Sequence, residues 1–181
     1  MAYTYEHPRP SVTTDAVIFF MEEEVLKVLL IKRKKDPFAG KFAIPGGFLD
    51  MDEKPEAGAQ RELEEETGLK ITKLYQVGAF GEVNRDPRGR IISIAHYAYN
   101  KNIDLSRLKA ADDASKVAAF EIFDLPELAF DHHQIIEASL RTFLNDIVLK
   151  YPHITDDFQL GDYELDYLTS KLNQWQLQMY R

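Results

Sequence analysis

The stretch GFLDMDEKPEAGAQRELEEETGL spans residues 47–69 and divides into a loop and a helix. Asp52, followed by Lys54 and Pro55, is a helix-start signal with proline in the first turn. We expect Gly68 to end the helix after about three and a half turns, because glycine adopts the left-handed conformation of a C-cap without strain. The stretch therefore predicts a loop that leads into a single helix.

Three glutamates of this helix point in similar directions. A helix advances about 100° per residue, so Glu62, Glu65 and Glu66 fall within roughly 100° of arc and project from one side. Two carboxylates about 4 Å apart repel by about 4 kcal/mol at an effective dielectric near 20, so the cluster needs a cation, proton uptake or full solvation. The chain has no cysteine, and hard oxygen ligands suit Mg²⁺ or Mn²⁺. An isolated acidic run is usually a solvated helix face, but the residues around this one favour a metal site.

The flanking residues extend the pattern. Gly47 is followed after five residues by Glu53, which is followed after seven by the run 61–69, RELEEETGL. This resembles the Nudix box (Gly, five residues, Glu, seven residues, Arg-Glu-apolar-any-Glu-Glu-any-Gly-apolar), and every specified position matches. At roughly 5 to 7% per fixed residue type, nine such matches arise by chance with a probability on the order of one in ten million. Glu53 is expected to orient Arg61 through a charge-assisted pair, the alternative being two independent surface charges.

The resemblance implies a fold and a chemistry. The fold class is α/β (α+β), a Nudix-type αβα sandwich with a mixed β-sheet between helices. The reaction is metal-dependent hydrolysis of a nucleoside diphosphate linked to another group, with Mg²⁺ as the cofactor and Mn²⁺ as a substitute. The implied metal ligands are Glu62, Glu65, Glu66 and the backbone carbonyl of Gly46 or Gly47.

The general base stays open at this point. Members of the superfamily recruit it from the box or from another loop. Glu65 or Glu66 is the candidate inside the box, and Glu82 or Glu121 is the alternative outside it. With Arg61 and Glu53, the two box glutamates complete the expected catalytic set.

Substrate recognition is expected outside the box. Residues 84–93 (NRDPRGRIIS), 41–48 (KFAIPGGF) and 128–132 (LAFDH) look like the corresponding segments of bacterial ADP-ribose pyrophosphatases, and the resemblance covers about residues 10–148. It implies cleavage of ADP-ribose to AMP and ribose 5-phosphate. Arginines in such a loop grip a diphosphate or a ribose and aromatic rings stack on adenine, whereas the loop alone would be a hairpin turn with solvated arginines. The expected substrate-binding residues are Arg85, Arg88, Arg90, Phe48 and Phe80.

Apolar patterning predicts the remaining elements. Two β-branched and aromatic runs that meet across residues 22–24 predict a β-hairpin within residues 12–33. A loop rich in Gly and Pro is expected over residues 36–52. Further strands are expected within 71–82, 91–99 and 116–123, and helices over 131–150 and 163–180.

The helix over 131–150 is expected to pack on the sheet, because its apolar residues have helical spacing. Asp131 is its expected N-cap. His132 and His133 follow, and a histidine near a helix N-terminus could meet a phosphate, although two histidines alone are weak evidence for a metal site. The apolar residues are Ile135, Ile136, Leu140, Phe143, Leu144, Ile147 and Val148.

The last helix, over 163–180, repeats apolar residues alternately every three and four positions, which is typical of docking on another helix. We therefore expect a Nudix domain over residues 1–150 and a helical extension over residues 151–181. The extension is expected to pack on the domain or on a second subunit, as in a homodimer. Its stripe consists of Leu165, Leu168, Leu172, Trp175 and Met179.

The amino-acid composition limits the kinds of ligand and partner that we expect for this protein. With 22 basic and 30 acidic residues the net charge is −8, so we expect a small nucleotide ligand and no nucleic acid. No apolar run approaches the roughly 18 residues that span a bilayer, and residues 1–10 do not resemble a signal sequence, so no membrane is expected. Together with the lack of cysteine, this predicts a cytoplasmic protein.

Two alternative functions remain. One is hydrolysis of another nucleotide, such as a nucleotide sugar or a nucleoside triphosphate. The other is a non-catalytic, ADP-ribose-sensing transcriptional regulator with a winged-helix domain. The complete box disfavours the regulator, as do the acidic charge and the roughly 30 residues after Lys150, about half of a winged helix.

Overall fold

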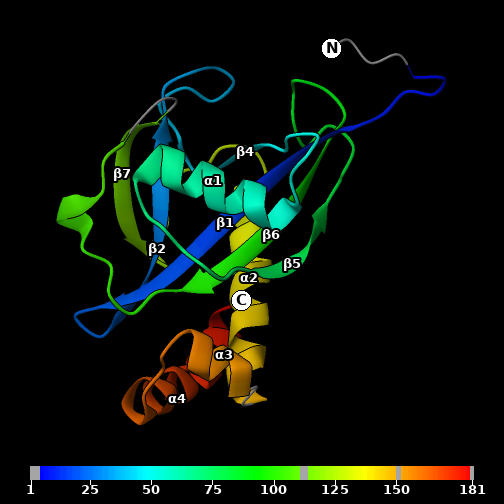
Figure 1. The fold of residues 1–181 in the computed structure, drawn as a ribbon. Coiled ribbons are helices and arrows are strands. Elements are labelled where there is room, and N and C mark those ends of the chain that lie inside the picture. The colour runs from blue at the N-terminus through cyan, green and yellow to red at the C-terminus, as the bar shows by residue number, and fades with distance from the viewer. Residues whose placement is uncertain (1–4, 111–113, 150–151, 180–181) are drawn as a thin grey trace.

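Within residues 5–110, 114–149 and 152–179, which a computed structural model describes, seven strands form one mixed sheet (Figure 1). The strand order is β3-β2-β1-β6-β5, with β4 paired to β1 and β7 paired to β2. The central pair β1 and β6 is parallel, and the other pairs are antiparallel. The strands are β1 (Ser11–Glu22), β2 (Val25–Arg33), β3 (Phe42–Ala43), β4 (Gly46–Phe48), β5 (Tyr75–Phe80), β6 (Ile91–Tyr99) and β7 (Ala114–Glu121).

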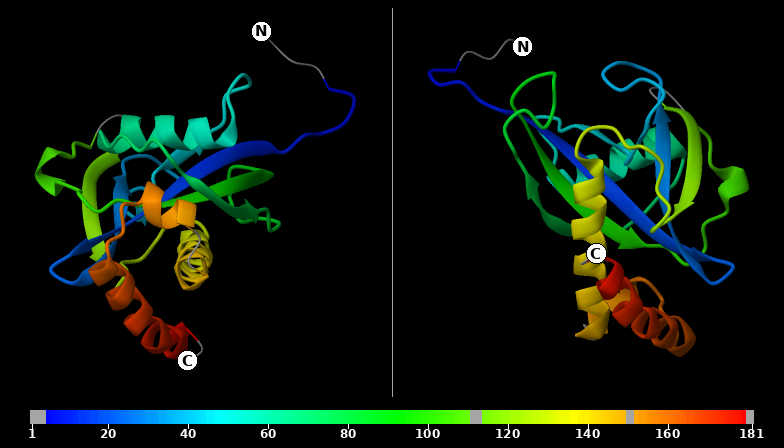
Figure 2. Two further views of the ribbon diagram at one scale, coloured as in Figure 1. Left: turned by 60° about the horizontal axis from the view of Figure 1, so that its bottom comes forward. Right: turned by 180° about the vertical axis from the view of Figure 1, so that it is seen from behind.

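Helices cover both faces of this sheet (Figures 1 and 2). α1 (Pro55–Thr67) lies on one face and α2 (His132–Val148) on the other, so the predicted αβα arrangement with a mixed sheet is confirmed. Beyond α2 follow α3 (Pro152–Asp157) and α4 (Asp162–Met179), and a short 3-10 helix, η1 (Leu105–Arg107), precedes β7. In the part of the chain that the structure describes, no helix has the length and apolar character needed to cross a bilayer.

α1 has the predicted bounds. Pro55 occupies the first turn, and the N-cap is Lys54, two residues after Asp52. Gly68 adopts φ 74° at the C-cap, the left-handed conformation that glycine tolerates. Leu63 is fully buried, which anchors the helix to the sheet.

The predicted hairpin over residues 12–33 is confirmed. β1 and β2 pair up to Glu22 and Val25, and the two residues between them, Glu23 and Glu24, have φ of 51° and 62°. Positive φ at both loop residues matches the right-handed twist of a hairpin. The middle of β1 is buried throughout, as expected for a central strand covered by helices on both faces.

The prediction of a continuous loop over residues 36–52 was wrong in part. Two short strands lie within it: β3 pairs with β2, and β4 pairs with β1 through Gly46↔Asp15 and Phe48↔Thr13. The partner of β4 lies about 30 residues earlier in the chain, a pairing that local turn propensity does not report. β5 is also shorter than the predicted 71–82, because Leu74 is buried ahead of the strand and its N–H donates to the Glu56 carboxylate.

α2 carries most of the core on its face of the sheet. Its predicted apolar residues are buried, with Phe143 stacked on Phe19 and Tyr99. Val148 is the exception, since it is 52% exposed at the last position of the helix. A fully buried side chain of this kind contributes roughly 1.5–3 kcal/mol, so this interface is a major part of the fold's stability.

The C-terminal helices contact the remainder of the chain. Tyr167 donates a hydrogen bond to the backbone carbonyl of Glu24, Lys101 pairs with Glu164, and Leu168 is fully buried. Leu165 packs against the core, whereas the side chains of Leu172, Trp175 and Met179 lie outside the described residues. A domain boundary near residue 150 and docking on a second subunit stay predictions.

Candidate functional site

Arg61 is the centre of a polar network on α1. Its guanidinium donates to both carboxylate oxygens of Glu53, at 2.7 and 3.2 Å, so the expected orienting pair is present. The same group donates to Glu62 at 2.8 Å, to Glu65 at 3.1 Å and to the carbonyl of Phe48 at 3.1 Å. These bonds tie the helix to the loop and strand that precede it.

Glu66 and Glu62 lie against β4. The backbone N–H of Gly46 donates to Glu66 at 2.9 Å, and a side chain on Gly47 would overlap the carboxylate of Glu62, which would then have to move. Glu66 is only 7% exposed, and burial raises its pKa to about 8, with the charges of Glu62 and Asp15 adding to the effect. Burial likewise raises the pKa of Glu62.

These groups fit a hard divalent cation, although they are not gathered into a finished site. Among the described residues, no three acidic or histidine side chains are close enough to hold one ion. The expected arc of three carboxylates is divided, because Arg61 lies between Glu62 and Glu65 while Glu66 faces Gly46. The donor set is nevertheless all oxygen, and two of its carboxylates have a raised pKa that a nearby cation would offset.

When divalent ions are removed, ionisation of the buried Glu66 is expected to destabilise the protein at high pH. Its folded pKa of about 8 exceeds the unfolded value of 4.5, so between these values unfolding releases a proton and the free energy of unfolding falls as the pH rises. In EDTA at pH 8.5, urea denaturation should find Glu66→Gln more stable than the wild type by a few kcal/mol, since one pKa unit corresponds to about 1.4 kcal/mol. The advantage should nearly vanish at pH 5. Equal stability of both proteins across this range would contradict the burial of a charge at this position.

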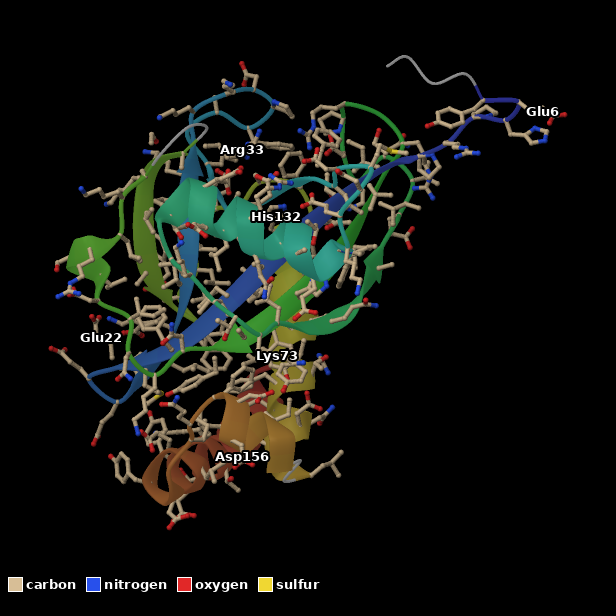
Figure 3. The ribbon with its side chains drawn as sticks, viewed as in Figure 1. Glu6, Glu22, Arg33, Lys73, His132 and Asp156 are labelled. Carbon is tan, nitrogen blue, oxygen red and sulfur yellow. The ribbon has the colours of Figure 1, made fainter. Side chains whose placement is uncertain are left out.

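β4 also lines a pocket of about 50 Å³. Gly46 and Gly47 therefore adjoin both the pocket and the carboxylates of α1. Figure 3 shows two of its lining residues, Arg33 and His132, at the same end of the sheet. The lining residues are Thr13, Asp15, Ile31, Arg33, Ile44, Gly46, Gly47, Phe48, Arg85, Asp86, Arg88, Phe130 and His132.

Arg85 is held in this pocket by Asp131. The pair is bidentate, with Nε to Oδ2 at 2.8 Å, and the Arg85 side chain is only 4% exposed. Asp131 occupies the predicted N-cap position of α2, but its carboxylate makes no capping hydrogen bond and binds Arg85 instead. The bond to Arg85 is bidentate and joins two charged groups, whereas a capping bond would have an uncharged backbone N–H as its donor.

The buried Asp15 was not predicted from the sequence as a residue of the site. Asp15 is buried in the middle of β1, where it accepts a hydrogen bond from Ser93 and lies 4.0 Å from Nε2 of His132. His132 accepts the backbone N–H of Ile44 at Nδ1, and burial lowers its pKa. The available signal was that Asp15 is the single acid within an otherwise uncharged strand segment, residues 11–21.

The remaining predicted residues lie outside the pocket lining. Arg90 donates to the carbonyls of Gly81 and Glu82 and so closes its own loop, and Phe80 packs against the core. Glu82 and Glu121, the alternative bases, are exposed and do not line the pocket.

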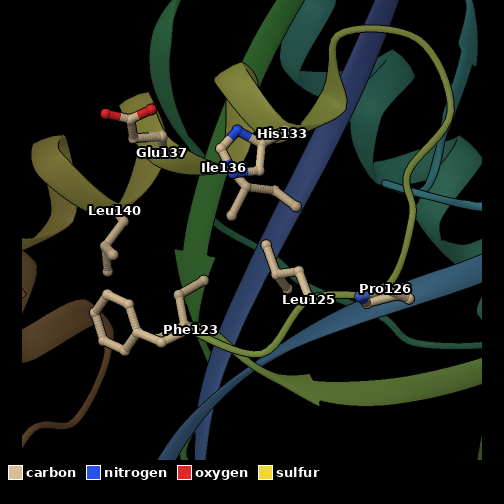
Figure 4. A pocket seen from close by; sticks show the side chains of 8 residues that line it. Phe123, Leu125, Pro126, His133, Ile136, Glu137 and Leu140 are labelled. Atoms are coloured by element: carbon tan, nitrogen blue, oxygen red, sulfur yellow. The ribbon is translucent and has the colours of Figure 1, made fainter. Parts of the chain in front are cut away.

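A larger cavity of about 380 Å³ lies elsewhere, between α2 and the segment that follows β7 (Figure 4). His133 and Glu137 are its charged or titratable lining groups, and the other lining side chains, such as Phe123 and Leu140, are apolar. Volume alone therefore does not identify the site. His133 also faces a different space from His132, which lines the smaller pocket.

Comparison with known proteins places this geometry in a family. A model of the NUDIX domain matches residues 11–144. The chain is 43% identical over 132 residues to a protein of Methanocaldococcus jannaschii named ADP-ribose pyrophosphatase, a match that covers 73% of this chain and 74% of that protein. Most of the sheet, α1 and most of α2 lie inside the matched region.

Two further relatives bind or respond to the same ligand by name. The chain is 32% identical over 143 residues to the ADPR responsive transcriptional repressor NtrR of Acinetobacter baylyi, which covers 77% of this chain and 57% of the repressor. The NUDIX domain of Shewanella oneidensis NrtR, solved with ADP ribose, has a TM-score of 0.68 and 32% identity, covering 75% of this chain and 90% of that domain.

Proposed function

This chain belongs to the NUDIX domain family, and on that premise we propose that it hydrolyses ADP-ribose to AMP and ribose 5-phosphate. The observation that carries the proposal is the network in which Arg61 binds three glutamates of the box, with Glu66 held by the N–H of Gly46 in β4. The same strand also lines a pocket that contains three arginines. The 43% identity to a protein named for the same activity supports the choice of substrate.

Nudix hydrolases generally use divalent metal ions, and we propose Mg²⁺ here, with Mn²⁺ as a substitute. The ligands would be Glu62, Glu65, Glu66 and the backbone carbonyl of Gly46 or Gly47. When bound, the ions would neutralise the diphosphate and lower the pKa of water.

The chain's own groups would position the reactants. Arg85, fixed by Asp131, presents a rigid guanidinium that suits a phosphate oxygen. Glu65 or Glu66 would accept the proton of the attacking water. Water adds to one phosphorus, the anhydride P–O bond breaks, and the two phosphates leave on AMP and ribose 5-phosphate.

A panel of nucleotides tests this proposal. The protein is incubated with Mg²⁺ and ADP-ribose, a nucleotide sugar or a nucleoside triphosphate, and the products are separated by chromatography. We expect AMP and ribose 5-phosphate in equal amounts, with ADP-ribose giving the highest kcat/KM. If another nucleotide were hydrolysed faster, that nucleotide would be the substrate. If none of the nucleotides were hydrolysed, the proposed enzymatic function would be wrong.

The second candidate is an ADP-ribose-binding regulator of transcription, which the similarity to the Acinetobacter baylyi repressor favours. In that case ADP-ribose would bind without being consumed, and it would change the affinity of the protein for an operator DNA. The product analysis separates the two candidates, because a regulator leaves ADP-ribose intact.

We further propose a cytoplasmic homodimer in which the apolar stripe of α4 supplies part of the interface. Leu168 is already buried within one chain and is therefore not available to a partner. Sedimentation velocity of the full chain at micromolar concentration tests this, and a monomer would contradict it.

A further inference from the structure

Two aromatic rings of the pocket face one guanidinium. Cζ of Arg88 lies 5.0 Å from the ring centroid of Phe48 and 5.2 Å from that of Phe130, over the face of each ring. A guanidinium is planar and stacks on aromatic faces in the way that a nucleobase does. The space between Arg88's two aromatic neighbours is therefore suited to a flat, aromatic group.

Arg88 is held there by Asp86. Its Nε donates to Oδ1 at 3.0 Å and its Nη2 to Oδ2 at 2.7 Å, while the backbone N–H of the same residue also donates to Oδ1. The Asp86 side chain is buried, whereas that of Arg88 is 36% exposed. Arg88 can therefore move outward while Asp86 stays in place.

The pocket is too small for a nucleotide while Arg88 remains inside. It measures about 50 Å³, whereas sites for small molecules typically enclose roughly 300–1,000 Å³. Most other charged groups in its wall are fixed: Arg85 is paired and buried, and Asp15 and His132 are buried. Arg88 is 36% exposed, so its outward movement would enlarge the pocket without displacing these buried groups.

The backbone supports a specific role for Phe130. This residue has φ 51°, a conformation that a bulky side chain rarely adopts. Its ring packs edge-on against Phe38, with centroids 4.8 Å apart, while Arg33 also lies over it. Such strain persists only where the surroundings enforce it, and here it directs the ring toward the pocket rather than the main core.

We propose that Phe48 and Phe130 form the nucleobase slot of this site and that Arg88 fills the slot until the diphosphate of an incoming nucleotide draws it out. The inference rests on the proposed function, whose substrate supplies both an adenine and a diphosphate. A phosphate can replace Asp86 as the bidentate partner of the guanidinium, so the released arginine keeps a charged partner. The nucleobase then stacks on the rings of Phe48 and Phe130 in place of the guanidinium.

Binding of the two products tests the slot without any hydrolysis. AMP carries the base and ribose 5-phosphate does not, so calorimetry on Phe48→Leu and Phe130→Leu should show weaker binding of AMP by about 5- to 100-fold. Ribose 5-phosphate should bind within about twofold of the wild type. Equal losses for both ligands, or no loss for AMP, would overturn the slot.

Matched variants make this result specific. Phe123 is 44% exposed at the other cavity, and Phe123→Leu should leave AMP binding unchanged. Phe130→Tyr should retain AMP binding because the ring face remains. Phe48 is 47% exposed, so Phe48→Leu tests the slot even if Phe130→Leu fails to fold.

Binding of adenosine tests separately whether Arg88 blocks the slot. Adenosine has a base but no phosphate to draw the arginine out, so Arg88→Ala should bind adenosine more tightly than the wild type does, by about three- to tenfold or more. If the empty carboxylate of Asp86 destabilises this variant, Asp86→Asn/Arg88→Ala serves instead. Unchanged or weaker adenosine binding would overturn the gate. Because no turnover is measured, a chain that hydrolyses a different adenine nucleotide would fail the product analysis and still pass here.

Discussion

Glu66→Gln is expected to lower kcat for ADP-ribose by at least about 10²- to 10³-fold while the fold remains intact. The amide keeps the shape and can still accept the N–H of Gly46, but it carries no charge for a cation and cannot accept a proton. Glu65→Gln should have a similar effect, because it likewise removes the charge of a proposed metal ligand and a candidate proton acceptor. Initial rates at saturating Mg²⁺, together with circular dichroism, measure both parts of the prediction.

Glu64 supplies a matched control on the same helix. It is partly exposed and pairs with Lys70 at 2.8 Å, away from the Arg61 network. Glu64→Gln should therefore leave kcat within about twofold of the wild type, since exposed ion pairs contribute little. A wild-type rate for Glu66→Gln, or an equal loss for Glu64→Gln, would remove the carboxylates of α1 from the mechanism.

Asp131→Ala is expected to lower the free energy of unfolding by about 3–5 kcal/mol, because it leaves the guanidinium of Arg85 buried without its partner. Loss of an ordinary N-cap would cost only about 0.5–2 kcal/mol. Urea denaturation distinguishes the two values.

The double variant Arg85→Met/Asp131→Ala separates the causes further. Removal of both charges should restore much of the lost stability, because no uncompensated charge is left. A capping defect would persist in the double variant. Glu137→Ala, which breaks the half-exposed pair with Arg141 on the same helix, is the control and should cost less than about 1 kcal/mol.

Local patterns in the sequence were sufficient for the elements that depend on nearby residues. Gly68 and Pro55 set the ends of α1, and the apolar spacing of α2 identified the residues that face the sheet. The pairing of Glu53 with Arg61 was also predictable, since both belong to one recognisable pattern. The first two features depend on helical geometry, which a single sequence records directly, and the third depends on a recognisable motif.

Other features depend on contacts between distant segments. β4 was missed because its partner, β1, lies about 30 residues earlier, and the carboxylate of Asp131 is taken by Arg85 from another loop. Phe130 was not among the predicted substrate-binding residues, although its segment was noted, because its ring direction comes from a positive φ that the sequence does not display. Arg90 looked equivalent to Arg85 and Arg88 in the sequence, yet it binds carbonyls of its own loop.

Calorimetric titration of Mg²⁺ into the protein with AMP present tests the central claim most directly, because the whole mechanism depends on carboxylates of α1 taking up divalent ions. We predict saturable Mg²⁺ binding by the wild type and its loss in Glu62→Gln/Glu66→Gln, with Glu64→Gln unaffected. No Mg²⁺ or Mn²⁺ uptake by the wild type, or equal uptake by the double variant, would contradict the account.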